Sequence, residues 1–483
     1  MTTRRPRALV VLHETGYFRM YGSVVCELER RGWDVMLAFD TPDKRDAPQV
    51  PPGAGPHVSS RGAVPSPDEG RWINQARLTM DYARYLEPAF AGAGYLRGRV
   101  AKMLPPVMQW LTRCPTLPAW VIGACIGVMR AVERLVPVDA RTLAFVRDVK
   151  PDLVVVSPLV SATLKGAGQT EMVKASQRLG VPAVVGVASW DHLTSKGLIR
   201  VVPDRVTVWN DVQKNEAVVL HRIPASRVSI TGAQPLDHWF EPATDPDGSA
   251  LRARLGVAAE RRVILFVGSS KNMAPGMSEV RFVKTWLRAI RASTDDVVRQ
   301  AFVLVRPHPS NLKQWARVDL RDPAATVHPA SYSGMPLSAP EVEEFRSSLA
   351  ASSAVVGVNT TAMIEAAIMR RPVLSVRLDV FAHSQRETLH FGYVSEGETG
   401  FVMVSDTLES HVGQLASVLA DPGSAVAAGD RFVDRFVRPG GRQQSATSQV
   451  VDVLEQSVRS ASTREVLVSV GSPGGHTERS RPA

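Results

Sequence analysis

One stretch in the second half of the chain combines hydroxyl, amide and carboxylate side chains with a pattern of strand, turn and helix. The apolar run Ala354–Val358 is typical of a buried strand. A polar turn of Asn359, Thr360 and Thr361 follows where a helix should begin, and Glu365 comes one helical turn later. Backbone N–H groups and hydroxyls in such a turn can hold a diphosphate, and the carboxylate can accept hydrogen bonds from a ribose. On the residues alone, a capped helix with a solvated Glu365 is an equally good interpretation.

Two further loops follow apolar runs that we interpret as strands of the same half. They contain Gly268, Ser269, Ser270 and Lys271 after the run Val263–Val267, and Arg306 and His308 after the run Phe302–Val305. Glycine permits close approach of the backbone to a ligand, while serine and lysine can meet phosphate oxygens. Prolines on both sides of His308 fix its loop. The plain alternative there is a rigid turn that carries a solvated histidine.

A loop in the first half of the chain follows the apolar run Val181–Val187. This loop, Ser189–Gly197, holds four chemically active side chains: Trp190, Asp191, His192 and Lys196. Such groups suit a sugar or polyol acceptor, with Trp190 as a stacking platform and Asp191 as a candidate catalytic carboxylate. The alternative is a polar turn in which Trp190 is buried.

The central stretch resembles the donor-nucleotide site of GT-B glycosyltransferases, of the non-hydrolysing sugar-nucleotide 2-epimerases and of the CDP-glycerol glycerophosphotransferases. The shared pattern is a strand, a small polar turn, a helix with Glu365 and a strand beginning R-P-V-L at Arg371. The resemblance implies that Thr360 and Thr361 bind a diphosphate and that Glu365 binds the ribose. It also implies that Arg306 and His308, in an R-P-H-P segment, meet charge on the leaving nucleotide. These families often have Gly or Ser where this chain has Asn359 and Thr360.

The opening of the chain resembles the first unit of GT-B enzymes. A strand within Arg7–Leu12 ends in His13, a helix follows, and R-G-W-D-V leads into the next strand. The resemblance implies that the loop after the first strand faces the interdomain cleft. His13 is therefore a candidate general base, because an imidazole can take the proton of an attacking hydroxyl. A histidine with satisfied hydrogen bonds at a strand end is the alternative.

The resemblance covers most of Arg7–Val458 and implies an α/β fold of the GT-B type, with two Rossmann-like doubly wound domains facing a cleft. We expect an acceptor domain over 1–239, a linker over 240–250 rich in Pro, Asp and Gly, a nucleotide-donor domain over 251–458 and a disordered tail over 459–483.

A helical insertion is expected over residues 71–136, outside the resemblance and broken at Pro105-Pro106 and Pro115. Its apolar run Leu117–Val128, with two tryptophans and flanking arginines, fits a peripheral contact with a membrane interface. The plainer interpretation, which we favour at this stage, is a helical cap packed on the sheet or on another subunit.

Composition narrows the class of protein. The chain has 483 residues, 44% hydrophobic and 22% charged, which is typical of a folded protein of two domains. The formal net charge of +10 favours anionic partners such as nucleotide diphosphates or lipid surfaces, and without a nucleic-acid motif we expect no nucleic acid partner. Three cysteines without metal spacing fit a reducing cytoplasm. We expect no cofactor and no metal, because no DxD-type motif is evident.

These patterns predict an enzyme that transfers a glycosyl or polyol-phosphate group from a nucleotide-activated donor to a glycan or lipid-linked acceptor hydroxyl. We expect surface-polysaccharide or glycolipid synthesis in the cytoplasm, at the inner face of the membrane. Two alternatives stay open. A sugar-nucleotide 2-epimerase needs carboxylates flanking the sugar, and no convincing set is evident. A protein that binds a nucleotide sugar without catalysis is the other.

Overall fold

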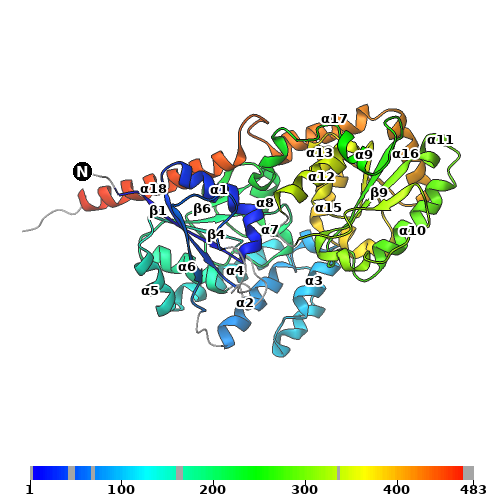
Figure 1. Ribbon diagram of the computed structural model, residues 1–483. Helices are drawn as coiled ribbons and strands as arrows, with labels where there is room; N and C mark the ends of the chain where they lie inside the picture. Colours follow the sequence, from blue (N-terminus) through cyan, green and yellow to red (C-terminus); the bar gives the residue numbers. More distant parts are fainter. Residues whose placement is uncertain (1–3, 42–48, 67–70, 159–166, 334–337, 471–483) are drawn as a thin grey trace, which may run out of the picture.

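The computed structural model describes residues 4–41, 49–66, 71–158, 167–333 and 338–470. Within them, two parallel β-sheets lie side by side along the chain (Figure 1). The first sheet has the strand order β3-β2-β1-β4-β5-β6-β7. Its strands are β1 (Arg7–Leu12), β2 (Asp34–Phe39), β3 (Val58–Ala63), β4 (Leu153–Ser157), β5 (Ala183–Gly186), β6 (Arg205–Val208) and β7 (Val228–Ile230).

The second sheet repeats this plan with the strand order β10-β9-β8-β11-β12-β13. Its strands are β8 (Val263–Val267), β9 (Phe302–Arg306), β10 (Ala325–Val327), β11 (Ala354–Gly357), β12 (Val373–Val376) and β13 (Val402–Ser405). In both sheets the strand order reverses once, between β1 and β4 and between β8 and β11. Open α/β sheets bind ligands beyond the carboxyl ends of the strands at such switch points.

Helices cover both faces of each sheet because the strands are apolar on both sides. In β1, Leu9 and Val11 join one apolar cluster, whereas Ala8, Val10 and Leu12 join the cluster on the opposite face. The helices of the first domain are α1 (Phe18–Arg30), α5 (Ala140–Val149), α6 (Ala167–Arg178), α7 (His192–Ser195) and α8 (Asp211–Val219).

The second domain carries more helices around its sheet. They are α9 (Ser249–Arg254), α10 (Ser278–Arg291), α11 (Asp296–Gln300), α12 (Ala339–Ala351), α13 (Ala362–Ile368), α14 (Ala382–Gln385), α15 (Leu389–Ser395), α16 (Leu408–Ala420) and α17 (Gly423–Phe432). The short α13 follows β11, so the strand, turn and helix pattern of the central stretch is present.

The segment between β3 and α5 is helical and breaks near its prolines. It contains α2 (Arg71–Arg84), α3 (Gly94–Ala101), a 3-10 segment (Pro106–Arg113) and α4 (Ala119–Leu135). Proline removes a backbone donor and clashes with the preceding turn, which explains the interruptions near Pro105 and Pro115. These helices lie below the first sheet in the view of Figure 1.

The last helix, α18 (Ala446–Val470), returns from the second domain and runs along the first (Figure 1). Val450, Val451 and Leu454 join the apolar cluster of β1 and α1, and Arg31 pairs with Asp452 at 2.6 Å. Our expectation of disorder from residue 459 differs from this structure, because the helix continues to Val470. Residues 471–483 of the expected tail lie outside the described residues.

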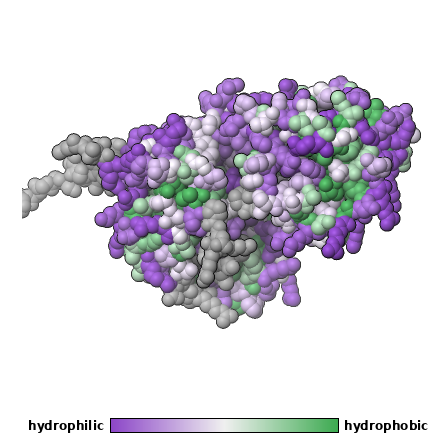
Figure 2. Space-filling model, viewed as in Figure 1, coloured by the Kyte–Doolittle hydropathy of each residue, from purple (hydrophilic) through white to green (hydrophobic). Residues whose placement is uncertain are grey.

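The two domains also share an apolar cluster. Trp190, Trp209 and Trp239 of the first pack with residues of the second such as Phe391 and Phe436. On the face shown in Figure 2, hydrophilic residues cover much of both domains, and hydrophobic residues gather in smaller patches. Among the described residues, no helix combines the length and the apolar character that crossing a membrane would need.

Candidate active site between the two domains

A histidine and a carboxylate meet where β1 and β2 end. The two strands pair in register up to Leu12 and Phe39, so His13 and Asp40 are the next neighbours. Nδ1 of His13 lies 3.5 Å from Oδ2 of Asp40, whose side chain is 2% exposed, whereas the His13 side chain is 29% exposed. Burial raises the pKa of Asp40, and the interaction with His13 opposes that rise. The accessible imidazole therefore has a buried carboxylate beside it, an arrangement that suits a general base.

The beginning of α1 carries an exposed cation. Arg19 is exposed, and among the described residues its side chain forms no ion pair or hydrogen bond. Its charge nevertheless acts on His308 and Glu365 of the second domain and on His192 of the first. Arg19 is thus an exposed cation whose charge reaches predicted site residues of both domains.

Glu365 is the predicted ribose ligand. It lies on α13 and is partly exposed. Burial raises its pKa to about 7, although the Trp239 indole, Arg19 and Arg306 oppose the rise. The Thr361 side chain makes no capping hydrogen bond, and Thr360 and Thr361 are both partly exposed. The two hydroxyls and the carboxylate therefore stay accessible to a ligand.

His308 begins the turn after β9. Its Nδ1 accepts hydrogen bonds from Ser310, from the backbone N–H at 3.1 Å and from the hydroxyl at 2.9 Å. This pattern places the ring proton on Nε2. Burial, and then the charge of Arg19, lower the pKa of His308 to about 4. At neutral pH His308 is therefore an uncharged donor, whereas we had expected it to neutralise charge as a cation.

The loop after β8 approaches the His308 turn very closely. A Cβ atom at Gly268 would lie 2.8 Å from the backbone nitrogen of His308, so only glycine fits. Beneath this loop, the Ser269 backbone N–H donates to Oε1 of the buried Glu279 at 2.6 Å. Ser270 is partly exposed and Lys271 is exposed, so both remain available to phosphate oxygens. Ser269 itself is buried, and its hydroxyl has no hydrogen-bond partner among the described residues.

Arg306 and Asn359 are buried in the protein and differ from our expectations for donor ligands. The Arg306 guanidinium donates to the Ser348 hydroxyl at 3.1 Å and stacks over the Phe345 ring. Burial lowers its pKa. The Asn359 amide donates to the carbonyl of Ser384. Their polar atoms bond to neighbouring segments of the protein, so a direct contact of either residue with a donor stays a prediction.

The loop 189–197 also differs from the expected acceptor surface. Trp190 is 4% exposed, and its ring packs edge-on against His390 with the ring centroids 4.9 Å apart. It therefore offers no open ring face for a sugar. Asp191 accepts hydrogen bonds from the hydroxyls of Ser189 and Ser195, each at 2.6 Å. Burial tends to raise the pKa of Asp191, but His192, His390, Lys196 and the Ser189 hydroxyl together hold it below its usual range. Asp191 thus braces the loop and is a poor proton acceptor.

His192 and Lys196 remain candidates in this loop. His192 is 5% exposed, burial lowers its pKa to about 4, and its Nδ1 has no hydrogen-bond partner among the described residues. Its ring faces that of Tyr17 at 6.4 Å between centroids, and Tyr17 in turn lies 6.0 Å from His13. Lys196 is partly exposed. These contacts place His192 on the same side of the first sheet as the His13–Asp40 pair.

The helical insertion positions this loop. Arg84 of α2 is fully buried and donates to the carbonyls of Leu193 and Lys196. Asp81 of α2 accepts from the Leu198 backbone N–H at 2.8 Å and pairs with Arg200. We had expected the helical insertion to lie outside the GT-B-like part of the chain. Its buried side chains instead hold the loop 189–197 in position.

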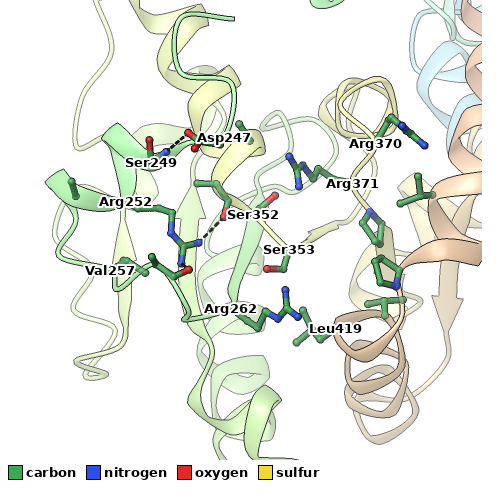
Figure 3. A pocket seen from close by; sticks show the side chains of 18 residues that line it. Asp247, Ser249, Arg252, Val257, Arg262, Ser352, Ser353, Arg370, Arg371 and Leu419 are labelled. Atoms are coloured by element: carbon green, nitrogen blue, oxygen red, sulfur yellow. Dashed lines mark hydrogen bonds between the residues drawn. The ribbon is translucent and has the colours of Figure 1, made fainter.

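A separate cavity of about 560 Å³ lies in the second domain, away from the interdomain residues (Figure 3). Its lining includes Arg262, Ser353 and Arg371, which come just before β8, β11 and β12. The cavity thus opens at the amino ends of these strands, whereas the His308 and Glu365 segments follow the carboxyl ends. Because ligands of open α/β sheets bind at the carboxyl ends, we assign the candidate site to the space between the domains.

Sequence reasoning gave no role to Arg19 or Asp40. Each had a usable signal: Arg19 follows His13 by six residues at the start of a helix, and Asp40 directly follows the second strand. Among the described residues, no group of three or more His, Cys, Asp or Glu is arranged to hold a metal ion.

Solved structures of similar fold are known. A glycosyltransferase from Rickettsia africae ESF-5 matches with a TM-score of 0.50 at 9% identity, over 94% of this chain and 99% of that chain. A Listeria monocytogenes protein, provisionally described as a UDP-N-acetylglucosamine 2-epimerase, matches with a TM-score of 0.51 at 10% identity, over 93% of this chain and 95% of that chain. No protein-family model and no curated protein sequence matches the chain. The fold is therefore the two-domain α/β fold of the GT-B type that the sequence predicts.

Proposed function

We propose that this protein transfers a glycosyl or polyol-phosphate group from a nucleotide-activated donor to an acceptor hydroxyl, without a metal ion. The observation that carries the proposal is the His13–Asp40 pair at the carboxyl ends of β1 and β2. The charge of Arg19, also in the first domain, acts on His308 and Glu365 of the second. An unpaired cation, a neutral donor and a carboxylate suit a nucleoside diphosphate, and the histidine pair suits a hydroxyl nucleophile.

The donor nucleotide binds on the second domain. Glu365, with its raised pKa, accepts hydrogen bonds from the ribose hydroxyls, and Thr360 and Thr361 donate to the diphosphate. Nε2 of His308 donates to a phosphate oxygen, and the guanidinium of Arg19 approaches from the first domain. Arg19 stabilises the charge that develops on the leaving nucleotide, which in other transferases falls to a metal ion.

The acceptor hydroxyl enters from the first domain. Nε2 of His13 takes its proton while the oxygen attacks the anomeric carbon, or the phosphorus of a polyol phosphate. The bond to the nucleotide breaks as the bond to the acceptor forms. Asp40, on the other ring nitrogen, orients the imidazole and stabilises the imidazolium. Supporting this role, the His13 side chain is partly exposed whereas Asp40 is buried.

We place the reaction in the synthesis of surface polysaccharide or glycolipid in the cytoplasm, with a glycan or lipid-linked acceptor. If Arg19 of the first domain contacts the donor on the second domain, donor binding brings the two domains together. An acceptor held by the first domain would then lie close to the donor. Loop 189–197 would contact that acceptor through the partly exposed Lys196, since Trp190 and His192 are both buried.

The test is product analysis of the purified chain incubated with nucleotide-linked sugars and with CDP-linked polyols, with and without glycan acceptors. Transfer appears as free nucleotide plus an acceptor of increased mass, and it survives EDTA. A donor whose sugar changes configuration without any acceptor would instead identify a 2-epimerase. Transfer that persists in a Thr361→Ala, Glu365→Ala double variant would overturn the donor-site assignment.

A further inference from the structure

Helix α4 presents an apolar surface outward. Trp120 is 77% exposed, Val128 65% and Leu135 83%, at intervals that follow one face of the helix. Ala124, Gly127 and Ala131 fill the positions between them and are also exposed. The adjoining 3-10 segment adds Val107 at 70% and Trp110 at 58%. We call Val107, Trp110, Trp120, Val128, Val132 and Leu135 the apolar face.

The inward side of the same helix carries two buried isoleucines, Ile122 and Ile126, in its first half and two buried charged residues in its second half. Arg130 is 8% exposed and donates to the carbonyls of Ile199, Arg200, His221 and Arg222. Glu133 is 4% exposed and pairs with Arg77 and Lys174. These bonds fix the rotation of α4 about its axis. The apolar face is therefore held outward by the fold.

The segment of chain that contains the apolar face has exposed charges of one sign. Residues 94–135 contain six basic side chains and a single acidic one, and that acid is the buried Glu133. Arg97, Arg99 and Arg130 donate to backbone carbonyls of the protein. The remaining three, Lys102, Arg113 and Arg134, are exposed and form no ion pair among the described residues.

We propose that this face docks on the surface of a lipid bilayer that carries anionic headgroups. Exposed tryptophans beside lysine and arginine suit the boundary between headgroups and acyl chains. A second copy of the chain fits less well, because a twofold interface would bring Lys102, Arg113 and Arg134 against the same cations. The inference does not depend on the proposed reaction, and it adds a lipid contact to the packed cap that we favoured from the sequence.

The test is sedimentation of the full chain with vesicles of phosphatidylcholine alone or with about a third phosphatidylglycerol. We expect binding to the anionic vesicles that weakens as salt rises. A Lys102→Gln, Arg113→Gln, Arg134→Gln variant should bind about 100-fold more weakly, since each cation near an anionic membrane contributes about fivefold. A Trp110→Ser, Trp120→Ser variant should lose at least tenfold.

Matched controls keep the result interpretable. Val297→Ser and Val380→Ser change side chains that are 48% and 53% exposed on the second domain, and vesicle binding should not change. Because all the altered positions are exposed, thermal melting should stay close to that of the parent chain. Absence of binding to anionic vesicles, or equal binding by the tryptophan variant, would overturn the proposal. A dimer that dissociates in the tryptophan variant would also overturn it and would identify a second copy as the occupant.

Discussion

Nδ1 of His13 faces Oδ2 of Asp40 at 3.5 Å, at the shared end of two paired parallel strands. A second pair of the same kind lies at the opposite end of β2, where Nδ1 of His57 is 3.2 Å from Oδ1 of Asp34. The first pair lies at the carboxyl ends of β1 and β2, where open α/β sheets bind ligands, and the second lies at the amino end of β2. The chain thus contains its own control for the chemistry of this pair.

Replacement of Asp40 by asparagine should lower kcat about 100-fold or more, because an amide cannot stabilise the imidazolium that forms at His13. The KM for the donor should change little, since Asp40 does not touch it. Asp34→Asn makes the same chemical change on the same strand and should leave kcat unchanged. Steady-state kinetics of the two variants measure whether Asp40 supports catalysis by His13. An equal effect of both substitutions on kcat would contradict a catalytic role for His13.

Removal of the Arg19 guanidinium should weaken donor binding. A charge-assisted hydrogen bond contributes about 1.5–3 kcal/mol, so Arg19→Ala should raise the donor KM at least about tenfold. Arg30→Ala is the matched control, because Arg30 lies on the same helix and, in the part of the chain that the structure describes, its exposed side chain pairs only with Glu27. A donor KM that is the same in both variants would contradict a phosphate contact by Arg19.

The close approach at Gly268 makes a prediction about both stability and activity. A methyl group there would meet the His308 backbone nitrogen at 2.8 Å, and backbone cannot move aside cheaply. Gly268→Ala should therefore lower the free energy of unfolding by about 1–3 kcal/mol and lower activity as the His308 turn shifts. Gly413→Ala in α16 has open space around it and should be neutral or slightly stabilising. Chemical denaturation of both variants would measure the difference.

Glu279 should make folding sensitive to pH. Burial raises its pKa to about 8 from an ordinary 4.5, so the folded chain binds a proton that the unfolded chain releases. This contribution to stability is complete below about pH 4.5 and is lost as the pH rises through about 8. Glu279→Gln keeps an acceptor for the Ser269 N–H but cannot ionise.

The comparison of unfolding free energies at pH 5 and pH 8 isolates this effect. Relative to the parent chain, the Glu279→Gln variant should gain on the order of a few kcal/mol across that range. Buried histidines such as His411, whose pKa burial lowers to about 4, act in the opposite direction in both proteins and cancel in the difference. An identical pH profile for the two proteins would show that Glu279 stays ionised.

The fold and the positions of the loops could be predicted because each depends on local pattern. Short apolar runs such as Val263–Val267 can be recognised as buried strands, and polar residues that follow them must lie at the ligand-binding edge of a parallel sheet. The breaks near Pro105 and Pro115 follow from proline geometry alone.

The remaining features depend on residues distant in sequence. The partners of His13 and Trp190 are Asp40 and His390, which only strand order and domain packing bring close. The sequence of the Trp190 loop is compatible with either an exposed or a buried loop. In the structure, Arg84 and the second domain cover it. The orientation of α4 likewise depends on the ion pairs of its Glu133 with Arg77 and Lys174. Periodicity within the helix does not reveal these partners.

The most direct test of the account is thermal unfolding of the purified chain with UDP-, GDP-, CMP- and CDP-linked donors, in parallel with Arg19→Ala and Glu365→Gln. A donor that binds only the folded chain, at about 100 times its dissociation constant, should add about 2.7 kcal/mol of stability. We expect such a shift from one nucleotide family, reduced in both variants. No shift with any donor, or equal shifts in the parent chain and both variants, would contradict a nucleotide site between the domains.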